Sequence, residues 1–318
     1  MKINIVAVTV TYNRVTTLKK TINALINQKK QLDKIIVVDN FSNEENRNSL
    51  KEIADNNDLV EVLWLNQNLG GAGGFYHGMK YAFEKYNPEW YWIMDDDAYP
   101  TKECLSTLIN HTDKLDNIGF LAPSIYGIDN QEYQMYHHKM ISKYKVNDIT
   151  AVENYNDLKE VTEIEANAFV GPLFSRHAIE ELGLPDGELF IYGDDTEYTY
   201  RITRKYKGYL IKDAIINHQD PPYQGKAVAP SGWWKEYYMF RNRFLFIDKF
   251  EKNIINKIMA KFYLISHLVR RILASQVKSQ YKGFRKIRRK ILIKSILDGI
   301  NKKNGKTIDP GEYIQSLK

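Results

Sequence analysis

Three adjacent carboxylates, Asp95, Asp96 and Asp97, have the spacing in this sequence that most directly suggests chemistry. They follow the apolar and aromatic run Trp90–Met94, which is typical of a buried strand. Because like charges repel, three carboxylates at a strand end favour a nearby cation such as a divalent metal. Ligands of open α/β sheets also bind beyond the carboxyl ends of strands. We therefore expect a metal site for a phosphorylated substrate; the alternative is a solvated acidic loop.

A second acidic cluster, residues 194–197, opens a predicted helix, and His218 follows two short predicted strands. Carboxylates in a first helical turn are favourable for dipole reasons alone, and a lone histidine is most often structural. In a functional interpretation, Asp195 could act as a general base. His218 could join two of the carboxylates in a manganese or magnesium site that leaves positions for diphosphate oxygens.

Three further segments stand where strands are expected to end. Residues 11–14 follow the first predicted strand, and Arg14 could pair with a phosphate. Asp39 closes the second, where it could accept hydrogen bonds from a ribose or a base, or could cap a turn. Residues 68–75 hold four glycines in five positions, which favours a turn with close backbone approach and amides that suit anionic groups.

The elements that must position these residues alternate along the first hundred positions. Helices are predicted at residues 15–28, 47–55 and from the glycine segment to about 86, and strands at 3–10, 34–38, 60–65 and 89–94. This alternation predicts an α/β fold, with a mainly parallel sheet flanked by helices on both faces. The middle of the chain is less regular, and we expect residues 126–159 to form a hairpin or long loop over the site.

The composition is that of an ordinary globular protein, with 318 residues, 43% of them hydrophobic and 26% charged. A single cysteine, Cys104, excludes a disulfide framework and a cysteine-based zinc site. The apolar N-terminal segment is short and is interpreted as the first strand. No stretch reaches the 18 apolar residues that a membrane span needs. We expect a cytoplasmic protein, peripheral on the inner face of the cell membrane.

Charge is divided unevenly along the chain. Residues 251–318 contain 17 Lys or Arg and four Asp or Glu, a net charge of +13, whereas residues 1–250 carry −7. Apolar residues at helical spacing alternate with Lys and Arg there, which predicts helices that bind an anionic membrane surface. The alternative is a helical bundle packed on the rest of the chain or on a second copy, in a homo-oligomer. Nothing resembles a nucleic-acid module, so we expect no nucleic-acid binding.

Taken in order, these segments resemble glycosyltransferase family 2, whose members have the GT-A fold. Thr-Tyr-Asn-Arg follows the first strand, Val-Val-Asp the second, Asn-Leu-Gly-Gly-Ala-Gly-Gly-Phe the third and Asp-Asp-Asp the fourth. The glycine segment, the 194–197 cluster with His218, and residues 237–243 are similar to bacterial galactofuranosyltransferases. The resemblance covers roughly residues 3–250. It implies a GT-A catalytic domain at 1–250 and a basic helical extension at 251–318.

The resemblance implies an inverting, metal-dependent transferase that moves galactofuranose from UDP-galactofuranose to a glycan on a polyprenyl-diphosphate lipid, in the synthesis of a capsule or O-antigen. The alternatives are a rhamnosyltransferase that uses dTDP-rhamnose and a non-catalytic protein that binds nucleotide sugars or glycans. The implied base is Asp195, and the implied ligands of Mn²⁺ or Mg²⁺ are Asp95, Asp97 and His218. The implied donor-binding residues are Thr11, Arg14, Asp39, Asn68, Gly70, Gly71, Asp95 and Asp96. These relatives have a Trp where this chain has Gly193, so for the acceptor we expect Tyr192, Asp194, Trp233 and Trp234.

Overall fold

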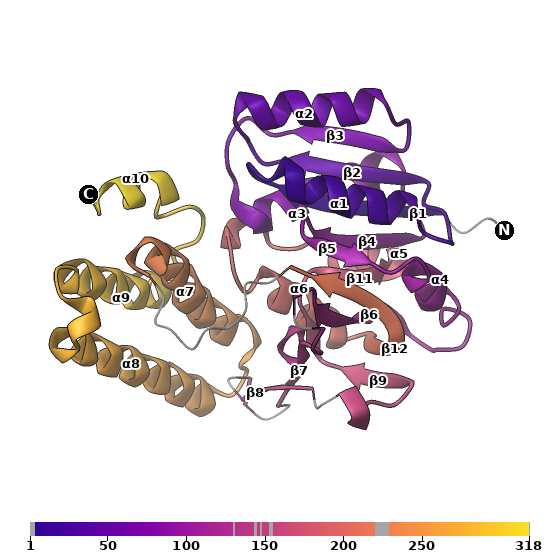
Figure 1. Ribbon diagram of the computed structural model, residues 1–318. Helices are drawn as coiled ribbons and strands as arrows, with labels where there is room; N and C mark the ends of the chain where they lie inside the picture. Colours follow the sequence, from indigo (N-terminus) through magenta and orange to yellow (C-terminus); the bar gives the residue numbers. More distant parts are fainter. Residues whose placement is uncertain are drawn as a thin grey trace. The chain divides into compact units, whose positions relative to one another are not determined.

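The computed structural model describes residues 4–129, 131–142, 145–146, 148–152, 155–219 and 229–317 (Figure 1). The chain divides into two compact units. The first, called here the sheet unit, comprises Met1–Met140, Thr150–Gly187 and Asp195–Pro222. The second, called the helical unit, comprises Ile141–Ile149, Glu188–Asp194 and Tyr223–Lys318.

The sheet unit begins with four parallel strands separated by helices, as the sequence predicts. The strands are β1 Ile5–Thr11, β2 Lys34–Asp39, β3 Val60–Trp64 and β4 Trp90–Asp95. The helices between them are α1 Val15–Ile26, α2 Glu44–Asp55 and α3 Gly70–Lys85. Register pairs Thr11 with Asp39, and Val10 with Asp95. The carboxyl ends of β1, β2 and β4 therefore meet at one edge of the sheet.

The rest of the sheet is mixed. Within the described residues it has nine strands, in the order β3-β2-β1-β4-β11-β6-β12-β5, with β9 also paired to β12. The later strands are β5 Ala98–Pro100, β6 Ile118–Gly127, β9 Val161–Ile164, β11 Val170–Ser175 and β12 Lys207–His218. Sequence patterns predicted two short strands where β12 is one. Its register shifts between Ile211 and Ile215, and such an irregularity interrupts the apolar pattern.

The expected hairpin or loop at residues 126–159 lies only partly within the described residues. Its described part contributes β7 and β8 to a small sheet in the order β10-β7-β8, whose third strand, β10, follows the segment. Its strands are β7 His138–Ile141, β8 Ile149–Ala151 and β10 Ala166–Asn167. This segment also contains the short 3-10 helices Met135–His137 and Tyr155–Asp157. Tyr126, Tyr133 and Tyr155 pack their rings together beside it.

Helices cover both faces of the main sheet, so that it has two cores. One core joins the strands to α1, α2 and α4 (Cys104–Ile109), through residues that include Leu18, Leu50 and Leu105. The other joins them to α3, α5 (Arg176–Leu182) and α6 (Asp194–Thr203), through residues that include Phe75, Ile179 and Tyr198. This is the predicted α/β arrangement, and it holds the strand ends rigidly.

The glycine-rich segment differs from its prediction. It forms the first turns of α3 itself rather than a turn before the helix. A Cβ on Gly74 would lie 2.4 Å from Val10 Cγ1, and one on Gly78 would lie 2.5 Å from Val8 Cγ1. These two glycines therefore let α3 pack closely on β1. A Cβ on Gly71, by contrast, would meet nothing within 4 Å, so this position borders open space.

The helical unit contains α7 Trp233–Phe250, α8 Ile254–Val277, α9 Arg285–Ile300 and α10 Pro310–Gln315 (Figure 1). The predicted boundary at residue 250 would assign α7 to the first domain, but α7 lies in the helical unit. The reason is a buried ion-pair cluster, in which Glu236 of α7 binds Arg271 of α8 and Arg288 of α9. Among the described helices, none has the length and apolar character required to cross a bilayer.

Candidate active site

The acidic triplet and His218 meet in the sheet unit. β12 pairs with β5 so that His218 lies opposite Ala98, the residue after Asp97. Nε2 of His218 is 3.2 Å from Oδ1 of Asp97. Asp95, Asp97 and His218 each offer one ligand atom, and these atoms lie within 4.8 Å of one another. The structure thus brings together the three residues predicted as metal ligands, although His218 lies 121 residues beyond Asp97.

The geometry of this cluster fits a hard divalent cation. Neighbouring ligands of an octahedral cation with bonds of about 2.1 Å lie about 3 Å apart. The separation between His218 and Asp97 is close to that value. Two carboxylates and one imidazole are also a donor set that suits such ions. The cluster can therefore hold a divalent metal and leave further coordination positions for a ligand.

Arg14 and Thr11 contact the triplet directly. Arg14 places Nη2 2.6 Å from Oδ2 of Asp97 and Nη1 2.9 Å from Oδ1 of Asp96. Thr11 Oγ1 donates to Asp96 Oδ2 at 2.7 Å. Asp96 is 4% exposed and held on both oxygens, so it orders the loop. The Arg14 side chain is 46% exposed and is able to exchange its partners for an anionic ligand.

The two buried carboxyls of the triplet differ in acidity. Burial raises the pKa of Asp96 to about 6, against the opposing effects of Arg14 and Thr11. Burial also acts to raise the pKa of Asp97, but the hydrogen bond and charge of His218, with those of Arg14, outweigh it. The pKa of Asp97 therefore lies below its usual value. Asp97 is thus the member of this pair suited to remain ionised and bind a cation.

Asp39 forms a second polar site, with partners that the sequence did not reveal. It is fully buried, and its Oδ1 accepts the Ser42 N–H at 3.1 Å. Its Oδ2 accepts from Nε of Arg47 at 2.7 Å. The Arg47 guanidinium also lies over the half-exposed rings of Phe41 and Trp64, at 5.5 and 5.3 Å from their centroids. The sequence pattern did not single out Arg47; its position within the first turns of the helix after Asp39 was the one available signal.

The start of α3 is fixed by two asparagines. Asn40 Nδ2 donates to the carbonyl of Gly70 at 2.9 Å, and Asn40 Oδ1 accepts the Leu69 N–H at 2.9 Å. Asn68 Oδ1 accepts the N–H of Gly70 at 2.8 Å. Asn68 and Gly70, predicted as donor-binding residues, therefore hold the backbone that presents Gly71 to open space. Asn40, whose role was not predicted, links this segment to the end of β2.

Asp195 lies at the N-terminus of α6 and is partly exposed. Its Oδ1 accepts from the backbone N–H and the hydroxyl of Thr196, at 2.5 and 3.1 Å. Lys139 Nζ in turn donates to the Thr196 hydroxyl at 2.6 Å. Within the described part of the chain, nothing donates to Oδ2 of Asp195. A carboxylate with one oxygen fixed and the other available is a suitable proton acceptor.

The segment before Asp195, in the helical unit, has a strained backbone. Phe190, Tyr192 and Gly193 all have positive φ, at 67°, 63° and 85°. Positive φ is costly for aromatic residues and natural for glycine, so Gly193 suits this turn, whereas Phe190 and Tyr192 are strained in it. Asn242 holds the segment in this shape: its Nδ2 donates to the carbonyls of Leu189, Ile191 and Tyr192, at 3.0, 3.0 and 2.6 Å.

The predicted acceptor residues have different surroundings. Tyr192 is 45% exposed and, with the partly buried Trp234, lines a cavity of about 610 Å³ in the helical unit. Trp233, by contrast, is 1% exposed and packs under Arg288 in the core of that unit. The prediction that Trp233 contacts the acceptor was wrong, because a ring this deeply buried cannot contact a glycan. Asp194 is buried as well, at 7% exposed.

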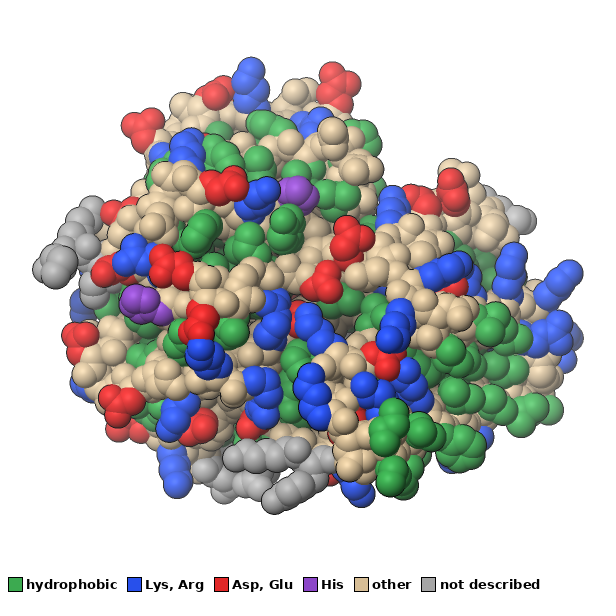
Figure 2. Space-filling view, turned by 180° about the vertical axis from the view of Figure 1, so that it is seen from behind, with side chains coloured by type: hydrophobic (Ala, Val, Ile, Leu, Met, Phe, Trp, Pro, Cys, Tyr) green, Lys and Arg blue, Asp and Glu red, His purple; other side chains and the backbone are tan. Residues whose placement is uncertain are grey.

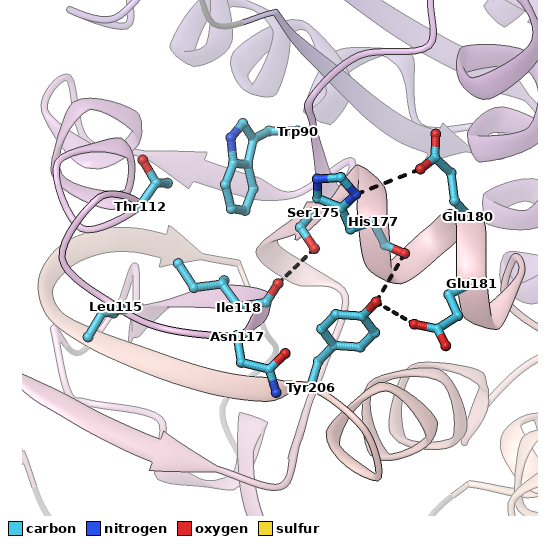
Figure 3. Close-up of a pocket in the computed structure, with 10 residues that line it drawn as sticks. All are labelled: Trp90, Thr112, Leu115, Asn117, Ile118, Ser175, His177, Glu180, Glu181 and Tyr206. Atoms are coloured by element: carbon cyan, nitrogen blue, oxygen red, sulfur yellow. Dashed lines mark hydrogen bonds and ion pairs between the residues drawn. The ribbon is translucent and has the colours of Figure 1, made fainter.

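A larger cavity lies away from these residues (Figure 3). It has a volume of about 640 Å³ and is lined by Trp90, at the amino end of β4, whereas Asp95 closes the same strand. Its acidic residues have partners: Glu180 pairs with Arg176, and Glu181 accepts from Tyr206 at 2.6 Å. This cavity is therefore not part of the candidate active site.

The sheet order, the helices on both faces and an Asp-x-Asp site at the strand ends define the GT-A fold of nucleotide-diphospho-sugar transferases. The sequence model described as "Glycosyl transferase family 2" matches residues 6–182, more than half of the chain. The chain belongs to this family, and the resemblance inferred from sequence is confirmed.

Two relatives and one solved structure show what the chain is similar to. Galactofuranosyltransferase GlfT1 of Mycolicibacterium smegmatis is 29% identical over 203 residues, which are 62% of this chain and 65% of that relative, just under two thirds. The dTDP-rhamnosyl transferase RfbF of Shigella flexneri is 27% identical over 288 residues, 88% of this chain and 92% of RfbF. Mannosyltransferase PcManGT from Pyrobaculum calidifontis, in complex with GDP-Man and Mn²⁺, matches with a TM-score of 0.57 and 13% identity, covering 95% of this chain and 88% of that one. At this identity, it shows the fold alone.

Proposed function

We propose that this protein transfers galactofuranose from UDP-galactofuranose to a glycan acceptor, with inversion at the anomeric carbon. The observation that carries the proposal is the cluster of Asp95, Asp97 and His218 at the carboxyl ends of the strands. Similarity to GlfT1 supports galactofuranose as the sugar.

The donor is proposed to lie across the strand ends. Asp39 is buried with Arg47 on its Oδ2, so it would accept a hydrogen bond from the uridine once Arg47 turns aside. The exposed rings of Phe41 and Trp64 nearby offer surfaces for a flat base. Arg14 would release a carboxylate and turn to the diphosphate. The backbone at Gly71, open to solvent, would lie against the donor sugar. Asn40 already orders the backbone before Gly71, and Arg47 already orders Asp39, which reduces the cost of binding.

A divalent metal, Mn²⁺ or Mg²⁺, is the proposed cofactor, and when bound it would stabilise the negative charge of the departing diphosphate. Asp95 and Asp97 would supply carboxylate oxygens, and His218 would supply Nε2. The Mn²⁺ in the complex of PcManGT, which shares the fold, supports this choice.

Asp195 is the proposed base. Its Oδ2 would take the proton of the acceptor hydroxyl, while Thr196 keeps Oδ1 in place. The oxygen of that hydroxyl would then form the new glycosidic bond as the bond to UDP breaks, in one in-line displacement. A single displacement inverts the anomeric carbon. Tyr192 and Trp234 are the proposed acceptor contacts.

The acceptor is proposed to be a glycan on a polyprenyl-diphosphate lipid, used for a bacterial surface polysaccharide such as a capsule or O-antigen. An enzyme with this acceptor would work peripherally on the inner face of the cell membrane. The net charge of +13 over residues 251–318 supports contact with anionic lipid.

The main rival is transfer of rhamnose from dTDP-rhamnose, favoured by the similarity to RfbF over a longer part of the chain. A donor screen distinguishes the two. We expect release of UDP from UDP-galactofuranose in the presence of Mn²⁺, with no release from dTDP-rhamnose or UDP-galactopyranose and none in EDTA. Release of dTDP alone would establish the rival. Binding of either donor without turnover, with lipid-linked acceptors supplied, would indicate a non-catalytic binding protein.

A further inference from the structure

Helix α8 exposes an apolar surface along its whole length. Nine large apolar side chains, exposed by 41% to 78%, repeat at helical spacing over its 24 residues. They are Ile254, Ile255, Ile258, Met259, Phe262, Tyr263, Val269, Leu273 and Val277, and they form what we call the α8 apolar face. Figure 2 shows hydrophobic side chains gathered over this helix. Soluble monomers rarely expose a continuous apolar patch of this kind.

Three of the four charged residues of α8 lie on the opposite side of the helix, and the fourth, Arg270, is exposed next to Val269. Lys261 pairs with Asp248 of α7 at 2.6 Å, and Lys257 donates to the Asp248 carbonyl at 3.1 Å. Arg271 pairs with the buried Glu236. A surface helix of a globular protein normally turns its apolar side inward and its charges outward. In α8 much of this order is reversed, so its outer side is suited to an apolar environment.

The surroundings of the α8 apolar face are positively charged. Of the four acidic residues in the segment 251–318, Glu251 and Asp298 are buried, and Asp309 pairs with Lys306 at 2.6 Å. The exposed side of α9 adds Lys286, Arg289 and Lys290. Figure 2 shows Lys and Arg side chains next to the hydrophobic group. An apolar face bordered by cations is complementary to a bilayer that contains anionic lipid.

We propose that the α8 apolar face inserts into the boundary between headgroups and acyl chains of an anionic bilayer, with α8 parallel to the membrane plane. At 1.5 Å per residue, α8 would lie along about 36 Å of the surface. A second copy of the chain fits this face less well, because two such contacts would bring together two segments of charge +13. The inference deepens the proposed function, since it names the surface that would reach a lipid-linked acceptor, but its test requires no turnover.

Flotation with vesicles tests the insertion. The full chain should bind vesicles of phosphatidylcholine with 30% phosphatidylglycerol and should bind pure phosphatidylcholine less. The double variant Ile258→Ser/Phe262→Ser should lose at least about tenfold in partition coefficient, because two exposed apolar side chains no longer insert. The control Met140→Ser, an exposed methionine of β7 in the sheet unit, should bind as the wild type does. Equal binding by all three proteins would overturn the proposal.

Site-directed labelling gives an independent readout of depth. The single Cys104 is buried, so a fluorophore on Phe262→Cys reports from one position. Its emission should shift to the blue on vesicle binding and should be quenched by spin-labelled acyl chains. A label on Met140→Cys should show neither change. Binding of the Phe262→Cys protein without quenching would mean adsorption by charge alone and would contradict insertion.

Two further measurements separate other outcomes. Without vesicles, the wild type and the double variant should sediment at the same mass; a dimer that Ile258→Ser/Phe262→Ser dissociates would identify this face as a contact between copies and overturn the proposal. Vesicle-free release of UDP should be unchanged in the double variant. If neither the wild type nor the double variant releases UDP but the vesicle experiments give the expected results, the proposed function is wrong and the insertion of the α8 apolar face is still supported.

Discussion

Replacing His218 with alanine probes the metal centre without altering a carboxylate. In the structure, His218 is 4% exposed, and Nε2 lies 3.2 Å from Asp97. Its loss removes one of three protein ligands and leaves a small space that water fills. Substitution of residues that only support metal ligands costs 10- to 100-fold in affinity in comparable sites. Loss of a ligand should therefore raise the dissociation constant of Mn²⁺ at least about tenfold, or about 1.4 kcal/mol.

The assay is release of UDP from saturating donor as Mn²⁺ is titrated into protein stripped with EDTA. The half-activating Mn²⁺ concentration should rise at least about tenfold in His218→Ala, with partial recovery of the rate at high Mn²⁺. His177→Ala is the matched control, because its side chain is 81% exposed on α5 and lies outside the cluster. If both variants required the same Mn²⁺ concentration as the wild type, His218 would not be a ligand.

Three other substitutions test separate parts of the account. Asp195→Asn should lower turnover by about 10²- to 10⁴-fold and leave UDP affinity unchanged in calorimetry; full activity would remove Asp195 as the base. Burial lowers the pKa of the His138 imidazole to about 3, below the ordinary 6.5. Between these two pH values the unfolded chain therefore binds a proton at His138 that the folded chain does not. The free energy of unfolding should consequently fall as the pH drops from 6.5 toward 3, by up to about 1.4 kcal/mol per pH unit. In chemical denaturation, His138→Asn, which can keep the hydrogen bond to Asn167, should show a smaller loss; an equal loss would assign it to other groups. Asn242→Asp turns a carboxylate toward the three loop carbonyls and should cost about 2 kcal/mol or more and reduce transfer, with UDP affinity retained; an unchanged melting temperature would contradict the restraint of Tyr192.

The parallel half of the fold could be predicted from sequence because its signals are local. Apolar strands alternate with amphipathic helices through Asp95, and each chemically suggestive residue follows a strand. The glycine segment could not be interpreted as fully, because Gly74 and Gly78 are required by Val10 and Val8, side chains far away in the sequence. Close packing between elements of this kind leaves no periodic pattern.

The candidate site, too, depends on tertiary contacts that the sequence pattern does not indicate. Asp95, Asp97 and His218 could be proposed as a group through a family resemblance, and β12 brings them together. Arg47 could not, because its importance arises from contacts with the Asp39 carboxylate and the Trp64 ring that its residue type does not indicate. The buried position of Trp233 was likewise not evident from the sequence. The Trp233 ring is covered by Arg288, which is held by an ion pair with Glu236, 52 residues earlier in the chain. Tertiary contacts decide what single residue types leave open.

Asp95, Asp97 and His218 are proposed to hold the divalent metal of a UDP-sugar transferase. Anomalous diffraction at the manganese edge, from crystals soaked with Mn²⁺ and UDP, tests this proposal directly. We expect a peak within about 2.3 Å of oxygens of Asp95 or Asp97 and of Nε2 of His218, with the UDP diphosphate completing the shell. Bound UDP with no peak at this cluster, or a peak held by other residues, would contradict it.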